Sequence, residues 1–166
     1  MKVFLSVVIY FPIFYHSQAF QMTSNQFNLS CDGIDGLSGS VTLFPSPIKL
    51  PGYIILSAYG KLNVDIPQTA TAKTTLKQLV EGHWKDVPCK DGFFGNCTIE
   101  SVCSLISKYG VPIPCPLASQ PFNIYQTLPL HISITDLEVG NYTGTVKVYD
   151  DGKEIICASE SFSLSK

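Results

Sequence analysis

Residues Val87 to Cys103 read V-P-C-K-D-G-F-F-G-N-C-T-I-E-S-V-C, and this stretch decides the fold. It holds three cysteines, and two adjacent phenylalanines, Phe93 and Phe94, lie between the first two. A loop that is cross-linked near both ends can hold apolar side chains in water without collapsing. Exposed apolar groups of this kind mark a contact with a ligand or a membrane. We therefore interpret the loop as a lipid-contacting element, with the alternative that one of the two phenylalanines packs under the loop.

The first 19 residues have the features of a secretory signal peptide. Lys2 supplies a positive start, Val3 to Tyr15 is an apolar run, and Ser17-Gln18-Ala19 resembles a cleavage site. A signal anchor is the alternative, but the run is short for a bilayer of roughly 30 Å hydrocarbon. We expect a signal peptide over residues 1–19, one domain over residues 20–166, and a secreted or lysosomal location.

Six cysteines in a secreted chain predict disulfide bonds, although six allow 15 pairings. No pair has the C-x-x-C spacing of a zinc site, so we expect no metal. Three N-x-S/T sequons fit the secretory route, because each marks an asparagine for glycosylation at the surface. The asparagines are Asn28, Asn96 and Asn141.

Charge and motifs exclude two large classes of function. The chain has eleven lysines and no arginine, and without Lys2 ten basic residues face thirteen acidic ones, a net charge of −3. This balance argues against nucleic-acid binding. Nucleophile-elbow, zinc-protease and nucleotide-binding motifs are missing, and His83 and His131 have no neighbouring nucleophile motif. We expect no catalytic residue, no cofactor and no enzyme activity.

Three segments alternate apolar and polar residues with a period of two, which is typical of half-buried strands. They are Gly52–Val64, Ala70–Trp84 and Gly140–Tyr149. Asp150-Asp151-Gly152 predicts a tight turn into a returning strand from Lys153 to Leu164. The pattern predicts an all-β sandwich or barrel. Weaker strands are expected over Asn25–Cys31, Ser38–Phe44, Pro121–Tyr125 and Leu130–Thr135.

One segment, Thr98 to Lys108, has apolar residues at helical spacing. Thr98 is suited to cap its start, while Gly110 and Pro112 would end it. We predict a short helix here that is tethered at Cys103. A second apolar stretch follows, and we expect three of its residues to join Phe93 and Phe94 in dipping into a membrane. These residues are Tyr109, Val111 and Ile113.

At these segments the chain resembles the MD-2-related lipid-recognition (ML) family, over nearly its whole length after the leader. The segments that carry the resemblance are Gly82–Cys89, Gly95–Cys103, Pro114–Pro116, Gly140–Tyr142 and Asp151–Cys157, with Cys31-Asp32 and Pro45–Gly52 before them. The cysteine block is the most specific of these segments.

The resemblance implies an immunoglobulin-like two-sheet β-sandwich opened into a cup, with an apolar cavity for acyl chains, one short helix and three disulfides. By position it implies the pairs Cys31–Cys157, Cys89–Cys97 and Cys103–Cys115. Residues on the inward faces of the strands would line the cavity or the core beside it. They are Ile54, Leu56, Leu62, Leu76, Val80, Trp84, Val146 and Val148.

The leading functional hypothesis is therefore a lipid-binding and lipid-transfer protein for glycolipids, such as gangliosides, or phospholipids. It would touch the membrane surface and present its lipid to a hydrolase, as a non-catalytic activator of a lysosomal hexosaminidase. Family members with that role carry a further cysteine pair after the helix, whereas no cysteine lies here between Cys103 and Cys115. The alternative is a protein-partner module, either an innate-immune lipid co-receptor or a phospholipase inhibitor.

Overall fold

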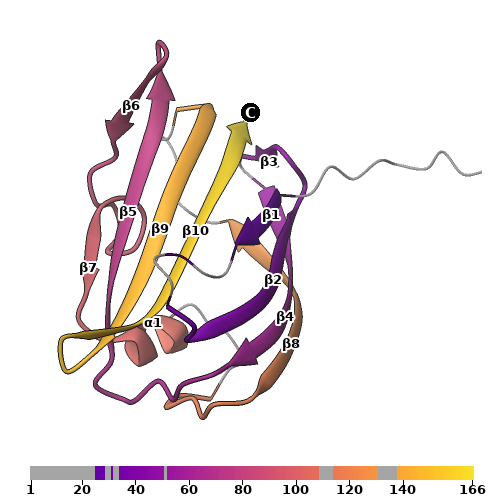
Figure 1. The fold of residues 1–166 in the computed structure, drawn as a ribbon. Coiled ribbons are helices and arrows are strands. Elements are labelled where there is room, and N and C mark those ends of the chain that lie inside the picture. The colour runs from indigo at the N-terminus through magenta and orange to yellow at the C-terminus, as the bar shows by residue number, and fades with distance from the viewer. Residues whose placement is uncertain (1–24, 29–30, 32–33, 51, 109–113, 131–137) are drawn as a thin grey trace, which may run out of the picture.

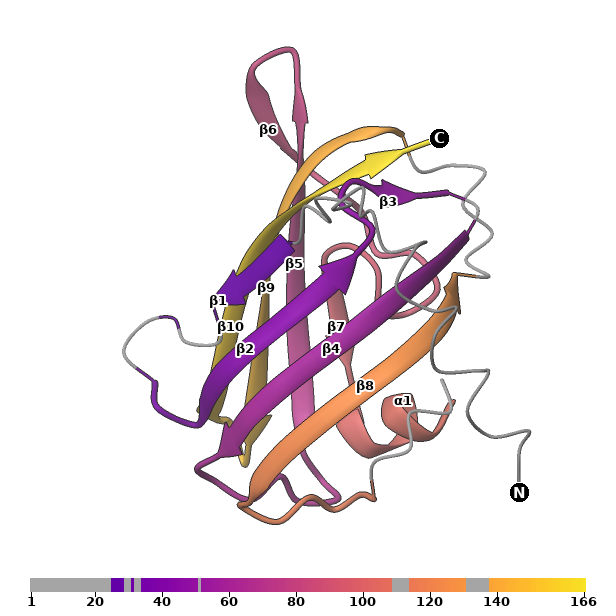
Figure 2. The same cartoon turned by 90° about the vertical axis from the view of Figure 1, so that its right-hand side faces the viewer.

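The computed structural model describes residues 25–28, 31, 34–50, 52–108, 114–130 and 138–166. These residues form ten strands and one helix, arranged as two facing layers (Figures 1 and 2). The strands are β1 (Asn25–Asn28), β2 (Leu37–Phe44), β3 (Ile48–Lys49), β4 (Gly52–Leu62), β5 (Thr71–Val80), β6 (His83–Asp86), β7 (Cys97–Ile99), β8 (Pro121–Leu130), β9 (Gly140–Asp150) and β10 (Lys153–Ser165), and the helix is α1 (Val102–Lys108). The expected signal peptide lies outside the described residues.

The two layers belong to one hydrogen-bonded path, in the order β6-β5-β9-β10-β1-β2-β4-β8. The path bends between β10 and β1, where Ser159 pairs with Asn28. One layer is therefore β6, β5, β9 and β10, and the other is β1, β2, β4 and β8 (Figure 2). β7 pairs with β5, and β3 runs parallel to the end of β10. The predicted two-layer all-β sandwich with one short helix is confirmed.

The alternation read from the sequence matches the burial of side chains. In β4, Ala58 and Leu62 are buried, whereas Tyr59 and Lys61 between them are exposed. In β5 the buried residues are Ala72 and Leu76, which are separated by an even number of positions and therefore lie on the same face of the strand. A strand with one apolar face gains stability by turning that face to the opposite layer, because buried apolar surface contributes about 25 cal/mol per Å².

The hairpin between β9 and β10 closes through a two-residue turn at Asp151 and Gly152. Both residues have positive φ, 46° and 78°, which is the backbone of a type I′ turn. Lys153 then pairs directly with Asp150. An Asp-Gly pair suits this conformation, since glycine has no Cβ to clash and aspartate tolerates the left-handed region.

The predicted helix begins four residues later than the sequence suggested. Thr98 and Ile99 belong to β7, where Ile99 is buried opposite Ala72. Thr98 and Ile99, which were expected to start the helix, therefore pair with β5 as part of a strand. Ser101 takes over the capping role, because its Oγ accepts a hydrogen bond from the Ser104 N–H at 3.2 Å. Gly110 and Pro112 lie outside the described residues.

Two strand predictions also change. The segment from Ala70 to Trp84 forms two strands, since the chain reverses at Glu81 and Gly82, both with positive φ. Conversely, the weak strand expected from Pro121 is longer, and β8 pairs with β4 continuously up to Leu130. The remainder of the other weak strand, residues 131–135, lies outside the described residues.

All three implied disulfides are confirmed: Cys31–Cys157, Cys89–Cys97 and Cys103–Cys115. The first joins the segment after β1 to β10 and spans 126 residues. The third joins α1 to the segment before β8. The covalent links thus lie at the bend between the layers, in the loop after β6, and at the helix.

The two disulfides of unequal span give a test of how the fold is stabilised. In the chain-entropy model, removing the link over 126 residues costs about 5 kcal/mol, and removing the link over 8 residues costs about 2.5 kcal/mol. Urea unfolding of Cys31→Ser/Cys157→Ser should therefore show the larger loss, with Cys89→Ser/Cys97→Ser as the matched variant. The opposite ranking would mean that local contacts of the short loop outweigh chain entropy.

Candidate functional site

The inner face of the β5–β9–β10 layer is organised in rows, because these three strands pair in register. Successive rows are Ala72, Val148 and Ile156; then Thr74, Val146 and Ala158; then Leu76, Gly144 and Glu160; then Gln78, Tyr142 and Phe162. Directly paired residues point to the same face, so each row projects toward the other layer. The middle of this face carries Ala158 and Gly144, which fill little of the space between the layers.

The buried core falls into two separate clusters, one on each side of these middle rows. The helix-end cluster consists of Leu62, Ile66, Ala70, Ala72, Ile99, Leu117, Val148 and Ile156. The β6-end cluster consists of Ile48, Leu76, Val87, Tyr142 and Leu164. A filled sandwich of this size usually has one contiguous core. Among the described residues, no buried side chain joins the two clusters.

Val146 gives the most direct sign of that open space. It lies on the same face of β9 as Tyr142 and Val148, which are 1% and 7% exposed. Nevertheless Val146 is 43% exposed. Because Val146 points between the layers, its exposure indicates that the described side chains leave the space beside it unfilled, and we refer to this space as the hollow. On the opposite layer Val41 of β2 and Leu56 of β4 are only half-buried.

A second apolar space lies at the helix end of the sandwich. It is a pocket of about 350 Å³ among β2, β4, β8 and the segment before β8. Its size is within the usual range for small-ligand sites. It borders Pro114, the first described residue after the apolar stretch that contains Tyr109, Val111 and Ile113. The lining residues are Leu37, Leu62, Ile66, Pro114, Leu117, Gln120, Phe122, Asn123 and Ile124.

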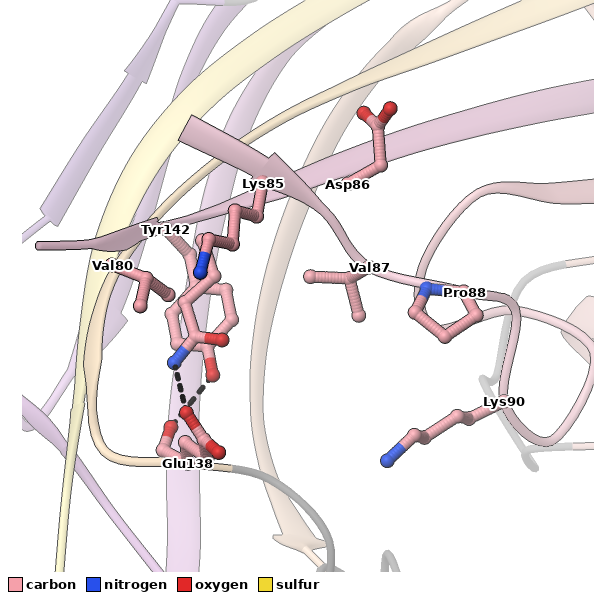
Figure 3. A pocket seen from close by; sticks show the side chains of 9 residues that line it. Val80, Lys85, Asp86, Val87, Pro88, Lys90, Glu138 and Tyr142 are labelled. Carbon is pink, nitrogen blue, oxygen red and sulfur yellow. Dashed lines mark hydrogen bonds between the residues drawn. The ribbon is translucent and has the colours of Figure 1, made fainter. Parts of the chain in front are cut away.

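A third space, of about 330 Å³, lies at the β6 end and has charged walls (Figure 3). Lys85 and Lys90 stand against Asp86 and Glu138 around it, so its formal charges balance. The Tyr142 hydroxyl donates to the backbone carbonyl of Glu138 at 2.6 Å. Burial, with the nearby Glu138 carboxylate, raises the pKa of Tyr142. This tyrosine thus has its ring in the β6-end cluster and its hydroxyl toward a polar pocket.

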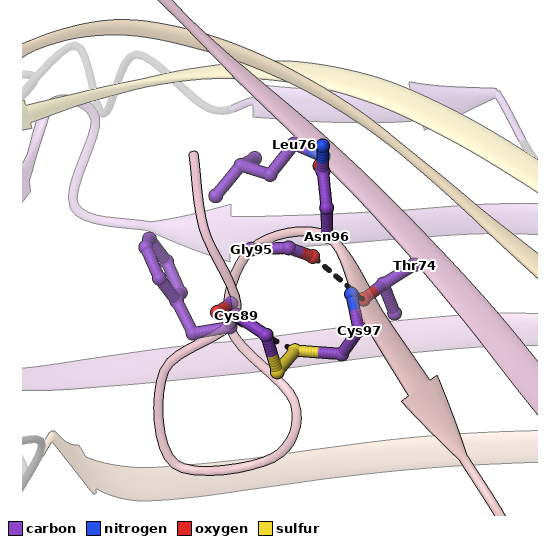
Figure 4. The surroundings of a disulfide bond; sticks show 7 residues. Thr74, Leu76, Cys89, Gly95, Asn96 and Cys97 are labelled. Atoms are coloured by element: carbon purple, nitrogen blue, oxygen red, sulfur yellow. Dashed lines mark hydrogen bonds between the residues drawn. A yellow bond between two sulfur atoms is a disulfide. The ribbon is translucent and has the colours of Figure 1, made fainter. Parts of the chain in front are cut away.

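The loop closed by Cys89 and Cys97 is bound tightly to β5 (Figure 4). The Thr74 hydroxyl donates to the Gly95 carbonyl at 2.7 Å and accepts from the Cys97 N–H at 3.1 Å. Between the stretches of β5 that pair with β7 and β6, the Leu76 N–H donates to Asn96 Oδ1 at 2.7 Å. The side chain of Asn96 therefore supplies the hydrogen-bond acceptor for the Leu76 N–H, at a position where β5 has no backbone partner from β6 or β7.

The two phenylalanines of this loop are less exposed than the sequence suggested. Phe94 packs against the β6-end cluster, and its ring meets Tyr142 edge to face at 6.5 Å. Tyr142 in turn stacks on Phe162 at 5.4 Å. Phe94 is thus the one of the two that packs under the loop, in agreement with the alternative given above, and Phe93 is half-buried. Aromatic pairing explains the difference, since it adds to the gain from burial alone.

Trp84 is the clear correction among the expected cavity residues. It lies on β6 after the reversal at Gly82, pairs with Leu79 on the outer face, and is 49% exposed. The predicted alternation fails because the turn resets which residues point inward.

The other expected cavity residues lie in three places. Leu62, Leu76 and Val148 lie in the core clusters, Val80 borders the charged pocket, and Leu56 and Val146 face the hollow. The side chain of Ile54 and the residues Tyr109, Val111 and Ile113 lie outside the described part.

Sequence reasoning missed one polar residue on the inner face, Glu160. It lies opposite Gly144, and its Oε2 is buried without a hydrogen-bond partner. Burial raises the pKa of the Glu160 carboxyl to about 8. The alternation in Ala158-Ser159-Glu160-Ser161-Phe162 places a single acidic residue among the inward positions, and this signal was available in the sequence.

The other chemical expectations concern sequons, metals and membrane spans. Asn141 is exposed, and its Oδ1 accepts a hydrogen bond from Ser163 at 2.7 Å. Glycosylation at Asn28, Asn96 and Asn141 stays a prediction.

Over the described ranges, no three His, Cys, Asp or Glu side chains gather as a metal site would require. Within the same ranges there is no helix with the length and apolarity needed to cross a bilayer.

Fold and site together define a class of protein: a two-layer all-β sandwich with an apolar pocket of about 350 Å³ at its helix end and an exposed inward residue, Val146. The chain belongs to the ML domain family, whose model matches residues 26–164. It is similar to the ganglioside GM2 activator of Mus musculus, with 27% identity over 145 residues that cover 75% of this chain and 73% of the relative. The Macaca fascicularis ganglioside GM2 activator is 27% identical over 142 residues, covering 75% and 74%.

Among solved structures, the chain resembles a Niemann-Pick type C2 protein from the Japanese carpenter ant. The TM-score is 0.49 with 12% identity, and the match covers 84% of this chain and all of that one.

The buried carboxyl of Glu160 predicts an unusual dependence of stability on pH. The native state keeps the proton up to a pKa of about 8, whereas the unfolded chain loses it near the ordinary value of 4.5. The contribution of Glu160 to the free energy of unfolding should therefore be fully present below pH 4.5 and fall between pH 4.5 and 8, by at most about 1.4 kcal/mol per pH unit.

Urea unfolding of wild type and Glu160→Gln at pH 5, 6 and 7 measures this effect. The glutamine does not titrate, so the variant should gain stability relative to wild type as the pH rises. Parallel pH profiles for the two proteins would contradict the assignment of a protonated Glu160.

Proposed function

We propose that this protein is a secreted or lysosomal lipid-binding and lipid-transfer protein. It takes a glycolipid of the ganglioside kind, or a phospholipid, out of a membrane and presents it to a hydrolase without doing chemistry itself. The observation that carries the proposal is Val146, an inward apolar residue that is 43% exposed between two separate core clusters. Membership of the ML domain family supports the same conclusion.

The energetics favour lipid over any small polar ligand. Each methylene moved from water into an apolar cavity contributes about 0.8 kcal/mol. The hollow beside Val146 and the apolar pocket of about 350 Å³ both offer surface for acyl chains. The described residues that line the pocket are mostly apolar, which suits the binding of acyl chains.

The two ends of the sandwich suit different parts of such a lipid. The pocket at the β6 end has balanced charges from Lys85, Lys90, Asp86 and Glu138, which suits a hydrated polar head group. Phe93, with Tyr109, Val111 and Ile113 after the helix, would contact the membrane surface during loading. This division follows the chemistry of the walls: apolar for chains, polar for the head.

The role as an activator rests on the similarity to two ganglioside GM2 activators. By that similarity the hydrolase would be a lysosomal hexosaminidase. The segment between Cys103 and Cys115 has no cysteine of its own and is held by that one disulfide. A surface that contacts the enzyme through this segment would differ from that of members with an added pair.

The direct test is lipid transfer. The purified protein is incubated with vesicles that contain ganglioside or phosphatidylcholine, then analysed by native mass spectrometry and by transfer of labelled lipid to acceptor vesicles. We expect a stoichiometric lipid complex and transfer that depends on protein concentration. No bound lipid and no transfer would end the proposal, and a stable protein complex formed without lipid would favour a protein-partner module instead.

A variant that fills the hollow should block binding without unfolding the protein. In Val146→Trp, the indole would exclude about two methylenes of the lipid, which costs roughly 1.6 kcal/mol, or slightly more than ten-fold in affinity. The matched control is Thr145→Trp, the neighbouring residue on the outer face of β9. We expect slow transfer for the first variant and normal transfer for the second. Equal transfer by both variants would show that the lipid lies elsewhere.

A further inference from the structure

Glu160 is an acidic residue in a position that normally belongs to an apolar one. Along β10 its inward neighbours are Ala158 and Phe162, and across β9 it faces Gly144. The residues between these inward positions are serines, and they bond along the outer face. Ser161 Oγ donates to Thr143 Oγ1 at 3.2 Å, and Ser163 Oγ donates to Asn141 Oδ1 at 2.7 Å. The polar face of the strand is thus outside, and Glu160 is the exception.

One oxygen of this carboxyl group has no hydrogen-bond partner in the described part of the protein. This oxygen, Oε2 of Glu160, is buried. Burial is also the cause of its raised pKa, with no contribution from a neighbouring charge. A buried polar group without a partner is rare in native proteins and calls for an explanation, such as a ligand that supplies the missing bond.

The surroundings of Glu160 indicate where that ligand would lie. Gly144 directly opposite has no side chain, and Val146 in the next row is the inward residue that remains 43% exposed. The side chain of Leu76 covers Gly144, so Glu160 lies at the boundary between the row of Val146 and the β6-end cluster. Apolar binding cavities commonly use a few such polar groups to fix the orientation of a ligand.

We propose that Glu160 is the polar recognition group of the lipid cavity, a hydrogen-bond donor to the carbonyl oxygen of an ester-linked or amide-linked acyl chain. The inference rests on the proposed lipid-binding function and adds to it which chemical class of lipid is selected. The carboxyl keeps its proton at neutral and acidic pH, because its pKa is raised to about 8. In that form it can donate to a carbonyl oxygen and bring no charge into the cavity.

A carbonyl suits the site better than a basic nitrogen does. An amine would take the proton from Glu160 and leave an ion pair in an apolar interior, and the desolvation of both charges opposes that outcome. A neutral donor and a neutral acceptor avoid this cost, and their hydrogen bond is stronger in a medium of low dielectric constant than in water. Lipids whose chains are attached only through ethers have a much weaker acceptor to offer.

The test uses two phospholipids that differ only in the linkage of their chains. Vesicles contain equal amounts of dipalmitoyl phosphatidylcholine and dihexadecyl ether phosphatidylcholine, and native mass spectrometry measures the ratio of the two lipids extracted by the protein. Wild type should favour the ester lipid roughly ten-fold, because the ether lipid leaves a buried donor unpaired. Glu160→Leu should extract both lipids equally.

Two further variants make the result specific to hydrogen bonding at this site. Glu160→Gln keeps an N–H donor at this position and should retain most of the preference for the ester. Glu154→Gln makes the same change on the same strand, at a residue whose Oε2 pairs with Lys147 at 3.2 Å, and should leave the ratio unchanged. Circular dichroism of each variant confirms that the fold is intact before its ratio is interpreted.

The outcomes separate this inference from the proposed function. If wild type extracts both lipids equally, or if Glu160→Leu keeps the wild-type ratio, the protein binds lipid but Glu160 does not select it. If wild type prefers hexadecylamine over hexadecanol and Glu160→Gln abolishes that preference, the site pairs a carboxylate with a cation, and the proposal is overturned. If wild type extracts no lipid at all, the proposed function fails and this inference fails with it.

Discussion

The register of β9 between β5 and β10 is the constraint on which the interior depends. Side chains alternate along a strand, so a shift of one residue would turn Tyr142, Val146 and Val148 outward and bring Thr143 and Thr145 inside. The two-residue turn at Asp151 and Gly152 sets the register on one side. On the other side the inward residues Ala72 and Leu76 set it, since each belongs to a core cluster. The hollow is thus a consequence of strand pairing, with small residues placed in its middle rows.

The loop held by Cys89 and Cys97 shows how covalent and hydrogen-bonded links combine. The disulfide alone would close a small loop, but the bonds from Thr74 and from Asn96 attach that loop to β5. Phe94 then packs on Tyr142 and closes one side of the β6-end cluster. The stretch that looks like a membrane-facing loop in the sequence therefore also completes the core beside the hollow.

Much of the fold could be predicted because its signals are local. Alternation identified β4, β5 and β9, the Asp-Gly pair identified the hairpin, and the resemblance gave the disulfide pairing. The failures involve competition at longer range: Ile99 joins β7 because β5 offers a pairing edge, and Trp84 faces outward because the chain reverses at Gly82. Neither the packing of Phe94 nor the open space beside Val146 follows from spacing along the chain, since both depend on what lies opposite in the second layer.

One feature of the topology determines where the two layers can separate. The hydrogen-bonded path crosses between the layers at β10 and β1, beside Cys31–Cys157, and its two ends, β6 and β8, are not paired with each other in the described part of the chain. That open edge is bridged at one end, because Cys103–Cys115 ties the helix after β7 to the segment before β8. Separating the two layers at the β6 end would therefore break no backbone ladder, whereas at the helix end the disulfide limits such a movement.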